Sequence, residues 1–330
     1  MNKVRITGTG SYAPKKVLSN QDLEKMVETS DEWISMRTGI RERHIAVNET
    51  TIDMAVKAGK AALKSSSVKA KDIDIVVVGT VTPEMVFPST ACHVQSGLGI
   101  KSGGAAFDVS AACSGFLYAL DVAEKYLKGG AAAKALVVGV DQFSRIVDWK
   151  DRSTCVLFGD GAGAVVLESI EGSGRGRKAR GILSSRIHSD GRKWEMLYVP
   201  GSINPSPFEH KRTELPYLRM NGNETFKVAV RTMESSIKEV LAESGLTADD
   251  ITLLIPHQAN RRIIKATMAR MGLDNDKVYL NMDRYGNTSA ASIPIALDEA
   301  ARVGRIKEGD IIVFVAFGGG LTWASAIVRW

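Results

Sequence analysis

An internal repeat constrains the fold of this chain more than any other feature of the sequence. The segment AKDIDIVVVGT at residues 70–80 matches ADDITLLIPHQ at residues 248–258, which lies 178 positions further on. The segment YALDVAEKYLKGG, which begins at Tyr118, matches IALDEAARVGRIK, which begins at Ile295, at a shift of 177 positions. Because two separate segments give nearly the same shift, we interpret the chain as a duplication of one α/β unit.

The repeat predicts two halves, residues 1–172 and 173–330, joined in the glycine- and arginine-rich stretch at residues 171–181. In each half, helical segments alternate with short apolar runs such as IVVVG, ALVVGV and IIVFVAF. Apolar runs without alternation are typical of strands that are buried on both faces. We therefore expect an α/β fold of two sheets, with helices packed between and outside them.

One uncharged run, at residues 311–328, approaches the length of a membrane span, which is about 20 residues. Three consecutive glycines divide it, so we expect two buried strands joined by a tight turn rather than a membrane helix.

Composition and charge exclude several classes of protein. With 44% hydrophobic and 24% charged residues, the chain is neither disordered nor a coiled coil. The net charge of +6 is spread along the sequence, which favours an anionic ligand or an acidic partner over nucleic acid. The cysteines Cys92, Cys113 and Cys155 are too few and too scattered for a disulfide framework or a metal site. Glycines and a proline interrupt the N-terminal segment before an apolar signal core develops, so we expect a cytoplasmic protein.

The chemistry is expected where a strand gives way to a helix, because open α/β proteins place their sites at such turns. Cys113 lies between an expected strand at residues 107–110 and an expected helix at 114–128. The equivalent turn of the second half contains YGNTSA, with Asn287 at the start of a helix, so the repeat places Cys113 and Asn287 at pseudo-symmetric positions. A helix N-terminus favours thiolate over thiol, which makes Cys113 a candidate nucleophile. The alternative for this cysteine is a small buried apolar residue.

Two further features lie at neighbouring strand ends. The strand at residues 253–255 ends at Pro256, and His257 follows it directly. The GGG turn at Gly318–Gly320 lets a backbone N–H group approach a ligand, as an oxyanion hole requires. The alternatives are a structural histidine, a helix cap for Asn287 and an ordinary tight turn. Because all four features converge, we expect a single active site.

Longer motifs carry a resemblance to a known family, and they run nearly from end to end of the chain. They are TSDEWISMRTGIRERHI (29–45), FPSTAC (87–92), FDVSAACSGF (107–116), FGDGAGA (158–164), MNGNETFKVAV (220–230), PHQAN (256–260), GNTSAAS (286–292) and FGGGLTW (317–323). With these residues the chain resembles the thiolase-fold condensing enzymes, and among them the β-ketoacyl-acyl carrier protein synthase III family. Elongating synthases of this fold have a second histidine where this chain has Asn287, and thiolases have a second cysteine near the C-terminal glycines. Plant-type polyketide synthases also use a Cys-His-Asn set, so the longer motifs distinguish the families better than these three residues do.

The resemblance implies a layered αβαβα sandwich and a decarboxylative Claisen condensation. An acyl-CoA primer, acetyl-CoA first, would acylate Cys113, while the N–H groups of Cys113 and Gly319 form the oxyanion hole. His257 and Asn287 would then stabilise the enolate of malonyl-acyl carrier protein, giving a 3-oxoacyl-acyl carrier protein at the start of fatty acid synthesis. The alternative is a longer or branched primer in a polyketide or secondary-metabolite pathway.

The resemblance also implies binding residues. The CoA site would comprise Thr29, Trp33, Arg37, Arg152, Gly222, Asn223 and Phe226; the acyl pocket Phe87 and Phe158; and the carrier-protein docking surface Lys227, Gln258, Arg261 and Arg262. Phe87 resembles a residue that reaches across a dimer interface to the partner's acyl pocket, so we expect a homodimer. We expect no cofactor and no metal beyond acyl-CoA as a substrate, and neither nucleic acid nor a membrane as a partner.

Three rival functions remain open from the residues alone. A nicotinamide-dependent oxidoreductase is suggested by G-x-G-x-x-A at Gly8, Gly10 and Ala13, although Pro14 follows where that motif needs a continuing helix. A cysteine hydrolase would use Cys113 and His257 to release a free acid. A binding protein without catalysis is the third.

Overall fold

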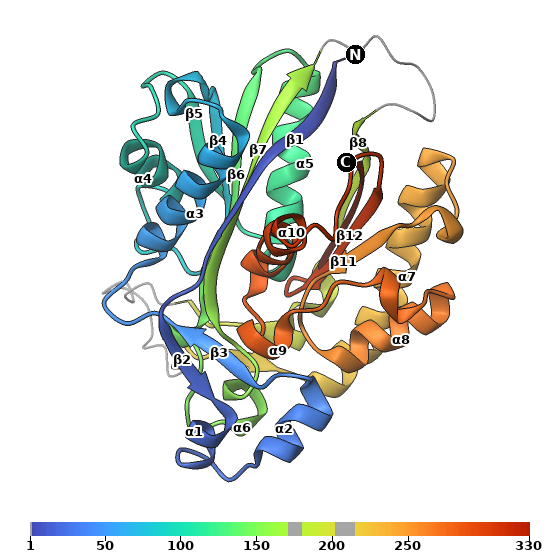
Figure 1. The fold of residues 1–330 in the computed structure, drawn as a ribbon. Helices are drawn as coiled ribbons and strands as arrows, with labels where there is room; N and C mark the ends of the chain where they lie inside the picture. The colour runs from blue at the N-terminus through green and yellow to red at the C-terminus, as the bar shows by residue number, and fades with distance from the viewer. Residues whose placement is uncertain (1, 171–179, 202–214) are drawn as a thin grey trace.

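The computed structural model describes residues 2–170, 180–201 and 215–330 of the chain, and its strands form two larger sheets (Figure 1). The first sheet has the order β1 (Lys3–Tyr12), β7 (Asp160–Ile170), β6 (Lys134–Gln142), β4 (Ile75–Gly79) and β5 (Ala105–Val109). The second has the order β8 (Gly181–Ser189), β13 (Thr322–Arg329), β12 (Ile311–Gly318) and β11 (Leu253–Pro256). Two short sheets pair β2 (Lys16–Ser19) with β3 (Glu42–Ile45) and β9 (Leu197–Tyr198) with β10 (Arg219–Met220).

The two larger sheets have corresponding topologies. In the first, β1, β7 and β6 are successively antiparallel, and β6, β4 and β5 are parallel. In the second, β8, β13 and β12 are antiparallel, and β12 and β11 are parallel. At the position that β5 has in the first sheet, the second sheet has a single parallel bridge, between Leu254 and Val278. The junction expected between residues 172 and 173 lies outside the described residues, so the division into two halves stays a prediction.

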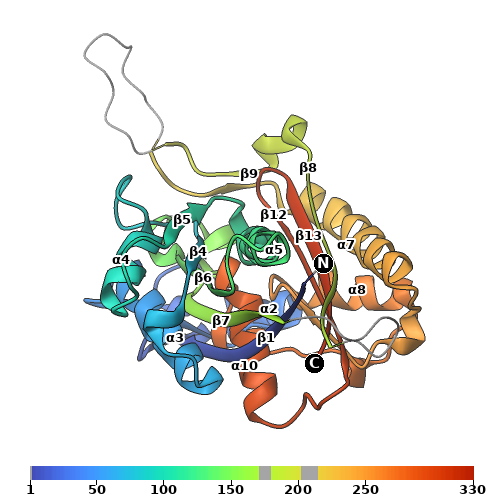
Figure 2. The ribbon, with the colours of Figure 1, turned by 90° about the horizontal axis from the view of Figure 1, so that it is seen from above.

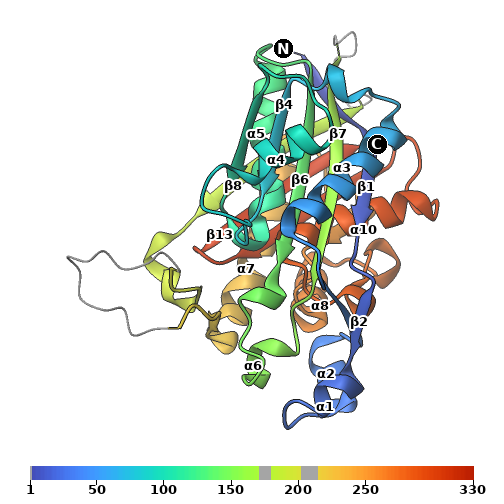
Figure 3. The same ribbon diagram turned by 90° about the vertical axis from the view of Figure 1, so that its left-hand side faces the viewer.

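Six of the helices in the described residues form three layers around these sheets (Figure 2). The α-helices are α1 (Asn20–Glu24), α2 (Asp31–Thr38), α3 (Thr51–Ser66), α4 (Thr90–Gly97), α5 (Gly115–Lys128), α6 (Arg152–Cys155), α7 (Gly222–Ser244), α8 (Arg261–Met271), α9 (Met282–Tyr285) and α10 (Ser292–Arg302). Helices α5 and α10 lie between the sheets, whereas α3 and α4 cover the outer face of the first sheet and α7 and α8 that of the second (Figure 2). The expected αβαβα layering is confirmed. Beyond the sheet ends, α1, α2 and α6 form a separate lobe (Figure 3).

The central layer is held by helices that are apolar on most sides. In α5 the side chains of Phe116, Leu117 and Leu120 are buried, and they pack with Leu297 of α10 in a core that includes both sheets. A helix with so broad an apolar surface has to be covered on both sides, which explains its place between two sheets.

The two glycines that suggested a nicotinamide-binding motif lie inside strand β1, where they pair with Val166 and Ala164 of β7. A Cβ atom at Gly8 would lie 2.5 Å from the carbonyl oxygen of Ala62 in α3, and one at Gly10 would collide with the backbone nitrogen of the same residue. The glycines therefore allow close packing of a strand on a helix. Because no strand-to-helix turn follows them, the oxidoreductase interpretation is wrong.

The uncharged run at residues 311–328 forms β12 and β13, which are antiparallel, with Gly318 opposite Thr322. The two expected strands are confirmed. In the described part of the chain, no helix combines the length and the apolar character needed to cross a membrane.

Candidate active site

Two equivalent turns meet at the centre of the molecule. Before α5 the chain makes a 3₁₀ turn at Ala112–Ser114, and before α10 it makes one at Ser289–Ala291. Ala112 and Ser289 both have left-handed backbone conformations, with φ of 45° and 50°. The two turns pack against each other, as the repeat predicts. At the shift of 177 residues, however, the position equivalent to Cys113 is Ala290, so Asn287 lies three residues before the position that symmetry would assign to it.

Cys113 lies where two cavities meet. One, of about 140 Å³, is lined by Phe226 at the start of α7 and also by Cys113, His257 and Asn287; we call it the α7 cavity. The other, of about 370 Å³, is lined by Gly319, Phe143, Ile146 and Leu218, again with Cys113; we call it the Gly319 cavity. Phe158 lines both. The structure thus brings together the three residues expected to be catalytic.

The thiol of Cys113 is buried, with 6% of the residue exposed. Burial raises the pKa of Cys113 to about 12, a hydrogen bond with Ser289 opposes this, and the nearby Asp141 carboxylate adds to it. Burial therefore opposes the effect of the start of α5, which is expected to favour the thiolate.

The glycine turn is in direct contact with Cys113. A Cβ atom at Gly318 would lie 2.7 Å from the backbone nitrogen of Cys113 and 3.0 Å from its Cβ atom. A side chain at this position would displace the cysteine, so glycine is required here. Gly319 follows in the turn and lines the same cavity as Cys113.

His257 is a neutral hydrogen-bond donor in this environment. Burial lowers its pKa to about 3, so the ring carries a single proton at neutral pH. Nδ1 lies 2.7 Å from Oγ of Ser292, and that oxygen also accepts a hydrogen bond from the backbone N–H of Gln258. We assign the Ser292 hydroxyl as the donor to Nδ1, which places the proton of the imidazole on Nε2.

Asn287 is fixed by its backbone and by its amide oxygen. Its N–H donates to the carbonyl of Leu157, and its carbonyl accepts from Gly159. The Oδ1 atom accepts from the N–H of Ser289 at 2.9 Å. With the oxygen engaged, the amide nitrogen is the group that can donate to a ligand in the α7 cavity.

The residues expected to bind the nucleotide of CoA form a cluster on α2 and α6. The guanidinium groups of Arg37 and Arg152 lie over the Trp33 ring, 5.0 and 5.2 Å from its centroid. Arg152 also donates to the carbonyl of Glu28 at 2.7 Å. The Thr29 hydroxyl is buried and has no hydrogen-bond partner among the described residues. A Trp33 ring face that holds a guanidinium can also hold a flat base, and Thr29 offers a hydroxyl without a partner.

The residues expected along the pantetheine channel divide into two groups. Gly222 and Phe226 line the α7 cavity, as expected, together with Met220 and Thr225, which the sequence did not single out. Asn223 is exposed and is not among the residues that line it.

The expected acyl-pocket residues differ in position. Phe158 is buried and stacks on Phe143 with ring centroids 4.7 Å apart. Phe87 is 83% exposed and lines neither cavity of its own chain.

Three of the four residues expected to dock a carrier protein reach the surface. Lys227 is exposed and pairs with Glu224, and Arg262 lies over the Phe226 ring at 5.7 Å. Arg261 is half-buried against Gly39. The expectation for Gln258 is wrong, because its side chain is buried and bonded to backbone groups of Pro256, Tyr279 and Asn281.

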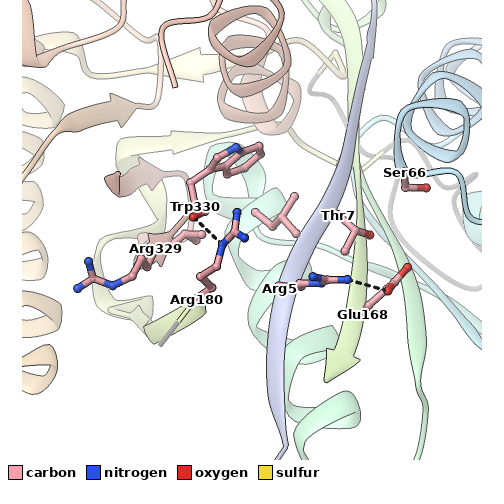
Figure 4. A pocket seen from close by; sticks show the side chains of 9 residues that line it. Arg5, Thr7, Ser66, Glu168, Arg180, Arg329 and Trp330 are labelled. Carbon is pink, nitrogen blue, oxygen red and sulfur yellow. Dashed lines mark hydrogen bonds and ion pairs between the residues drawn. The ribbon is translucent and has the colours of Figure 1, made fainter. Parts of the chain in front are cut away.

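Figure 4 shows a different cavity, of about 310 Å³, beside the first residues of β1 and the last of β13. Arg5 and Glu168 form an ion pair in it, and none of the site residues expected from the sequence lines it. Among the described residues, no group of three or more His, Cys, Asp or Glu side chains is placed to hold a metal ion.

Sequence comparison places these features in a family. Residues 107–191 match the model described as 3-oxoacyl-[acyl-carrier-protein (ACP)] synthase III, and residues 241–330 match that of its C-terminal part. The β-ketoacyl-[acyl-carrier-protein] synthase III of Caldanaerobacter subterraneus is 53% identical over 328 residues, which is 98% of this chain and 97% of the relative. That of Alkalilimnicola ehrlichii is 52% identical over the full length of both chains.

Solved structures agree with the sequence relatives. The 3-oxoacyl-[acyl-carrier-protein] synthase III of Aquifex aeolicus has a TM-score of 0.91 and 48% identity over all of both chains. The priming β-ketosynthase of the R1128 polyketide pathway has a TM-score of 0.90 over 99% of this chain and 96% of its own, but only 34% identity, so the polyketide alternative is not favoured. The thiolase-like fold expected from the sequence is confirmed. The chain belongs to the β-ketoacyl-[acyl-carrier-protein] synthase III family, the condensing acyltransferases that initiate fatty acid synthesis.

Proposed function

We propose that this protein condenses an acyl-CoA primer, acetyl-CoA first, with malonyl-acyl carrier protein through an acyl-Cys113 intermediate. The observation that carries the proposal is the convergence of Cys113, His257 and Asn287 on the α7 cavity, next to a second cavity lined by apolar side chains.

In the first half-reaction the sulfur of Cys113 attacks the thioester carbonyl. The N–H groups of Cys113 and Gly319 donate to the oxyanion, and CoA departs. The acyl chain then occupies the Gly319 cavity, where Phe143, Ile146 and Leu218 offer an apolar lining.

In the second half-reaction the malonyl thioester oxygen lies between Nε2–H of His257 and the amide nitrogen of Asn287. These two neutral donors stabilise the enolate as carbon dioxide departs, and the enolate carbon attacks the acyl group. Loss of carbon dioxide itself generates the carbanion, so the step needs no strong base and no cofactor. A histidine that burial keeps neutral suits this role, because it donates a hydrogen bond without carrying a charge.

The nucleotide of CoA binds at Trp33, with Arg37, Arg152 and Thr29 around it, and the pantetheine arm passes Phe226 to Cys113. The cation–π geometry of both arginines at Trp33 supports this assignment, because the same face that holds a guanidinium can hold a flat base. Lys227, Arg261 and Arg262 lie beside this route and would meet an acidic carrier protein.

The protein acts as a cytoplasmic homodimer in this proposal. Met85, Val86 and Phe87 are consecutive apolar residues that are 41%, 79% and 83% exposed. Adjacent exposed apolar side chains mark interaction surfaces, and a second copy of the chain would cover them while Phe87 closes the partner's acyl cavity.

Incubation with a panel of acyl-CoAs, followed by mass spectrometry of the protein, tests the proposal. We expect acyl mass on Cys113, greatest with acetyl-CoA, that disappears on addition of malonyl-acyl carrier protein as a 3-oxoacyl product forms. Release of free acid without condensation would favour the hydrolase. A preference for long or branched primers would favour the secondary-metabolite alternative.

A further inference from the structure

A buried carboxylate lies behind the candidate nucleophile, joined to it by one serine. Asp141 is at the end of strand β6 and is fully buried. Its carboxylate accepts the N–H of Ala290 at 3.2 Å, and the side chain of the preceding residue, Ser289, favours its ionised form. Ser289 Oγ in turn lies 3.6 Å from Sγ of Cys113, within hydrogen-bond range for sulfur. The polar side chains of Cys113, Ser289 and Asp141 are therefore neighbours, with Ser289 between the other two.

The hydrogen atoms on these three side chains determine which of them donates to which. A serine hydroxyl has one hydrogen and accepts at its oxygen, whereas an ionised carboxylate only accepts. When Asp141 is ionised, Ser289 must donate to it, and Cys113 S–H can then donate to Ser289. When the proton has moved to Asp141, Ser289 instead donates to the thiolate.

We propose that Asp141 takes the proton of Cys113 through Ser289 as the sulfur attacks the acyl thioester, and returns it to the departing CoA. The S–H bond of Cys113 breaks as Ser289 Oγ gains that proton and passes its own to Asp141, and the sulfur forms the bond to carbon. When the tetrahedral intermediate collapses, the CoA sulfur takes a proton from Ser289, which regains one from Asp141. The sum is acyl transfer between two thiols, with Asp141 and Ser289 unchanged.

The physical reason for such a proton relay is that it avoids a second negative charge in the buried site. Burial raises the pKa of Cys113, so the protonated thiol is favoured at neutral pH. A second anion beside a charged Asp141 is costly in a buried site. Transfer of the proton to Asp141 keeps a single negative charge in the site throughout. Burial also raises the pKa of Asp141 above that of an ordinary carboxyl, which makes it a better acceptor.

The other titratable group at the site cannot take this proton. Burial lowers the pKa of His257, and its Nδ1 lone pair already accepts from Ser292. His257 is therefore a donor to substrate rather than a base for Cys113.

Asp141 also has a structural role, which the test must separate from the relay. One oxygen accepts from Thr80, Thr82 and the N–H of Val81, and so fixes the loop after β4. Asp160 provides a matched control, because it is likewise buried and bonded to Ser144 and the N–H of Ala46. Asp160 lies opposite Gln142, so these two side chains share a face of the sheet. Because Asp141 precedes Gln142 in the strand, the side chain of Asp141 lies on the other face.

The test measures the rate of Cys113 modification from about pH 6 to about pH 10 in Ser289→Ala and Asp141→Asn. Two readouts are used: acylation by acetyl-CoA and alkylation by iodoacetamide, both read by mass. At neutral pH both variants should react about 100-fold more slowly than the wild type, the usual effect of removing a general base. Their rates should then rise about tenfold per pH unit, because the thiol must ionise unaided.

Ser289→Ala is expected to fold, because Ala112 already adopts the same left-handed conformation at the equivalent position. Asp160→Asn, and Ser236→Ala at a buried serine bonded to Ser325, should lower the melting temperature without changing the pH profile. If Asp141 acted only through its charge, Asp141→Asn would accelerate modification at neutral pH, and that result would overturn the relay. Unchanged alkylation profiles in both variants would overturn it too.

The proton relay rests on the proposed role of Cys113 as acyl acceptor. Measuring acylation and alkylation separately distinguishes failure of the relay from failure of the proposed function. Wild-type protein that is alkylated at Cys113 but never acylated would contradict the proposed function. The alkylation profiles would still decide the relay.

Discussion

The Ser292 hydroxyl lies 2.7 Å from Nδ1 of His257, and this hydrogen bond decides which ring nitrogen donates to substrate. Ser292→Ala should therefore lower malonyl decarboxylation by about five- to tenfold, the equivalent of about 1 kcal/mol. Acyl transfer to Cys113 should stay near the wild-type rate, because its oxyanion hole is made of backbone. Carbon dioxide release from malonyl-acyl carrier protein and acyl mass on Cys113 measure the two steps. Ser292→Thr keeps the hydroxyl and should restore part of the loss; equal losses in Ala and Thr variants would point to packing instead.

Cys113 and His257 should separate the two half-reactions when they are replaced. Cys113→Ala should abolish acyl-enzyme formation but retain some decarboxylation, because His257 and Asn287 still hold the enolate oxygen. His257→Ala should lose decarboxylation by about 100-fold or more and retain most acylation. Loss of both steps in His257→Ala would make the histidine the activating base of Cys113.

The buried His257 should make stability depend on pH. Its pKa is about 3 in the folded protein and about 6.5 in an unfolded chain. Between these values only the unfolded chain binds the proton, so the free energy of unfolding is fully maintained above about pH 6.5 and falls as the pH is lowered, by between about 1 and 2 kcal/mol per unit. Urea unfolding of the wild type and of His257→Gln at about pH 7 and pH 5 should show a smaller loss in the variant, by about 2 kcal/mol. An equal loss in both proteins would contradict the assignment.

Gly318 should tolerate no side chain. A methyl group there would lie 2.7 Å from the backbone nitrogen of Cys113, so Gly318→Ala should shift the turn that carries the nucleophile. We expect a loss of about 1–3 kcal/mol of stability, measured by urea unfolding, and acylation at least about tenfold slower. Gly191→Ala is the matched control, because nothing lies within 4 Å of its Cβ position, and it should match the wild type in both measurements.

The sequence predicted those parts of the structure that local patterns encode. The repeat predicted two layered sheets, and the motif containing Cys113 predicted the turn before α5. The burial of Cys113 was not predictable in this way, because the residues that remove the thiol from water come from distant parts of the sequence. The resemblance assigned Gln258 to the docking surface, yet backbone groups distant in sequence bind its side chain. Asp141 gave no signal at all, because Ser289, which makes it relevant, comes from the other half of the chain.

The basic residues around the α7 cavity give the last prediction. Lys227 and Arg262 are exposed, and Arg262 lies over Phe226, which lines that cavity. Replacing both by Glu should weaken the use of malonyl-acyl carrier protein by about tenfold or more at low salt, flatten its salt dependence, and leave acylation by acyl-CoA nearly unchanged. Exposed charges at an interface mainly steer encounter, and salt screens them over a Debye length of about 10 Å at 0.1 M.

Steady-state kinetics at several salt concentrations measure this effect, and the pair Lys60→Glu and Lys64→Glu on α3 is the charge-matched control. Because α3 covers the outer face of the other sheet, that pair should leave the use of carrier protein unchanged. Equal losses in both half-reactions would place Lys227 and Arg262 in the CoA site, and unchanged kinetics would place the docking surface elsewhere.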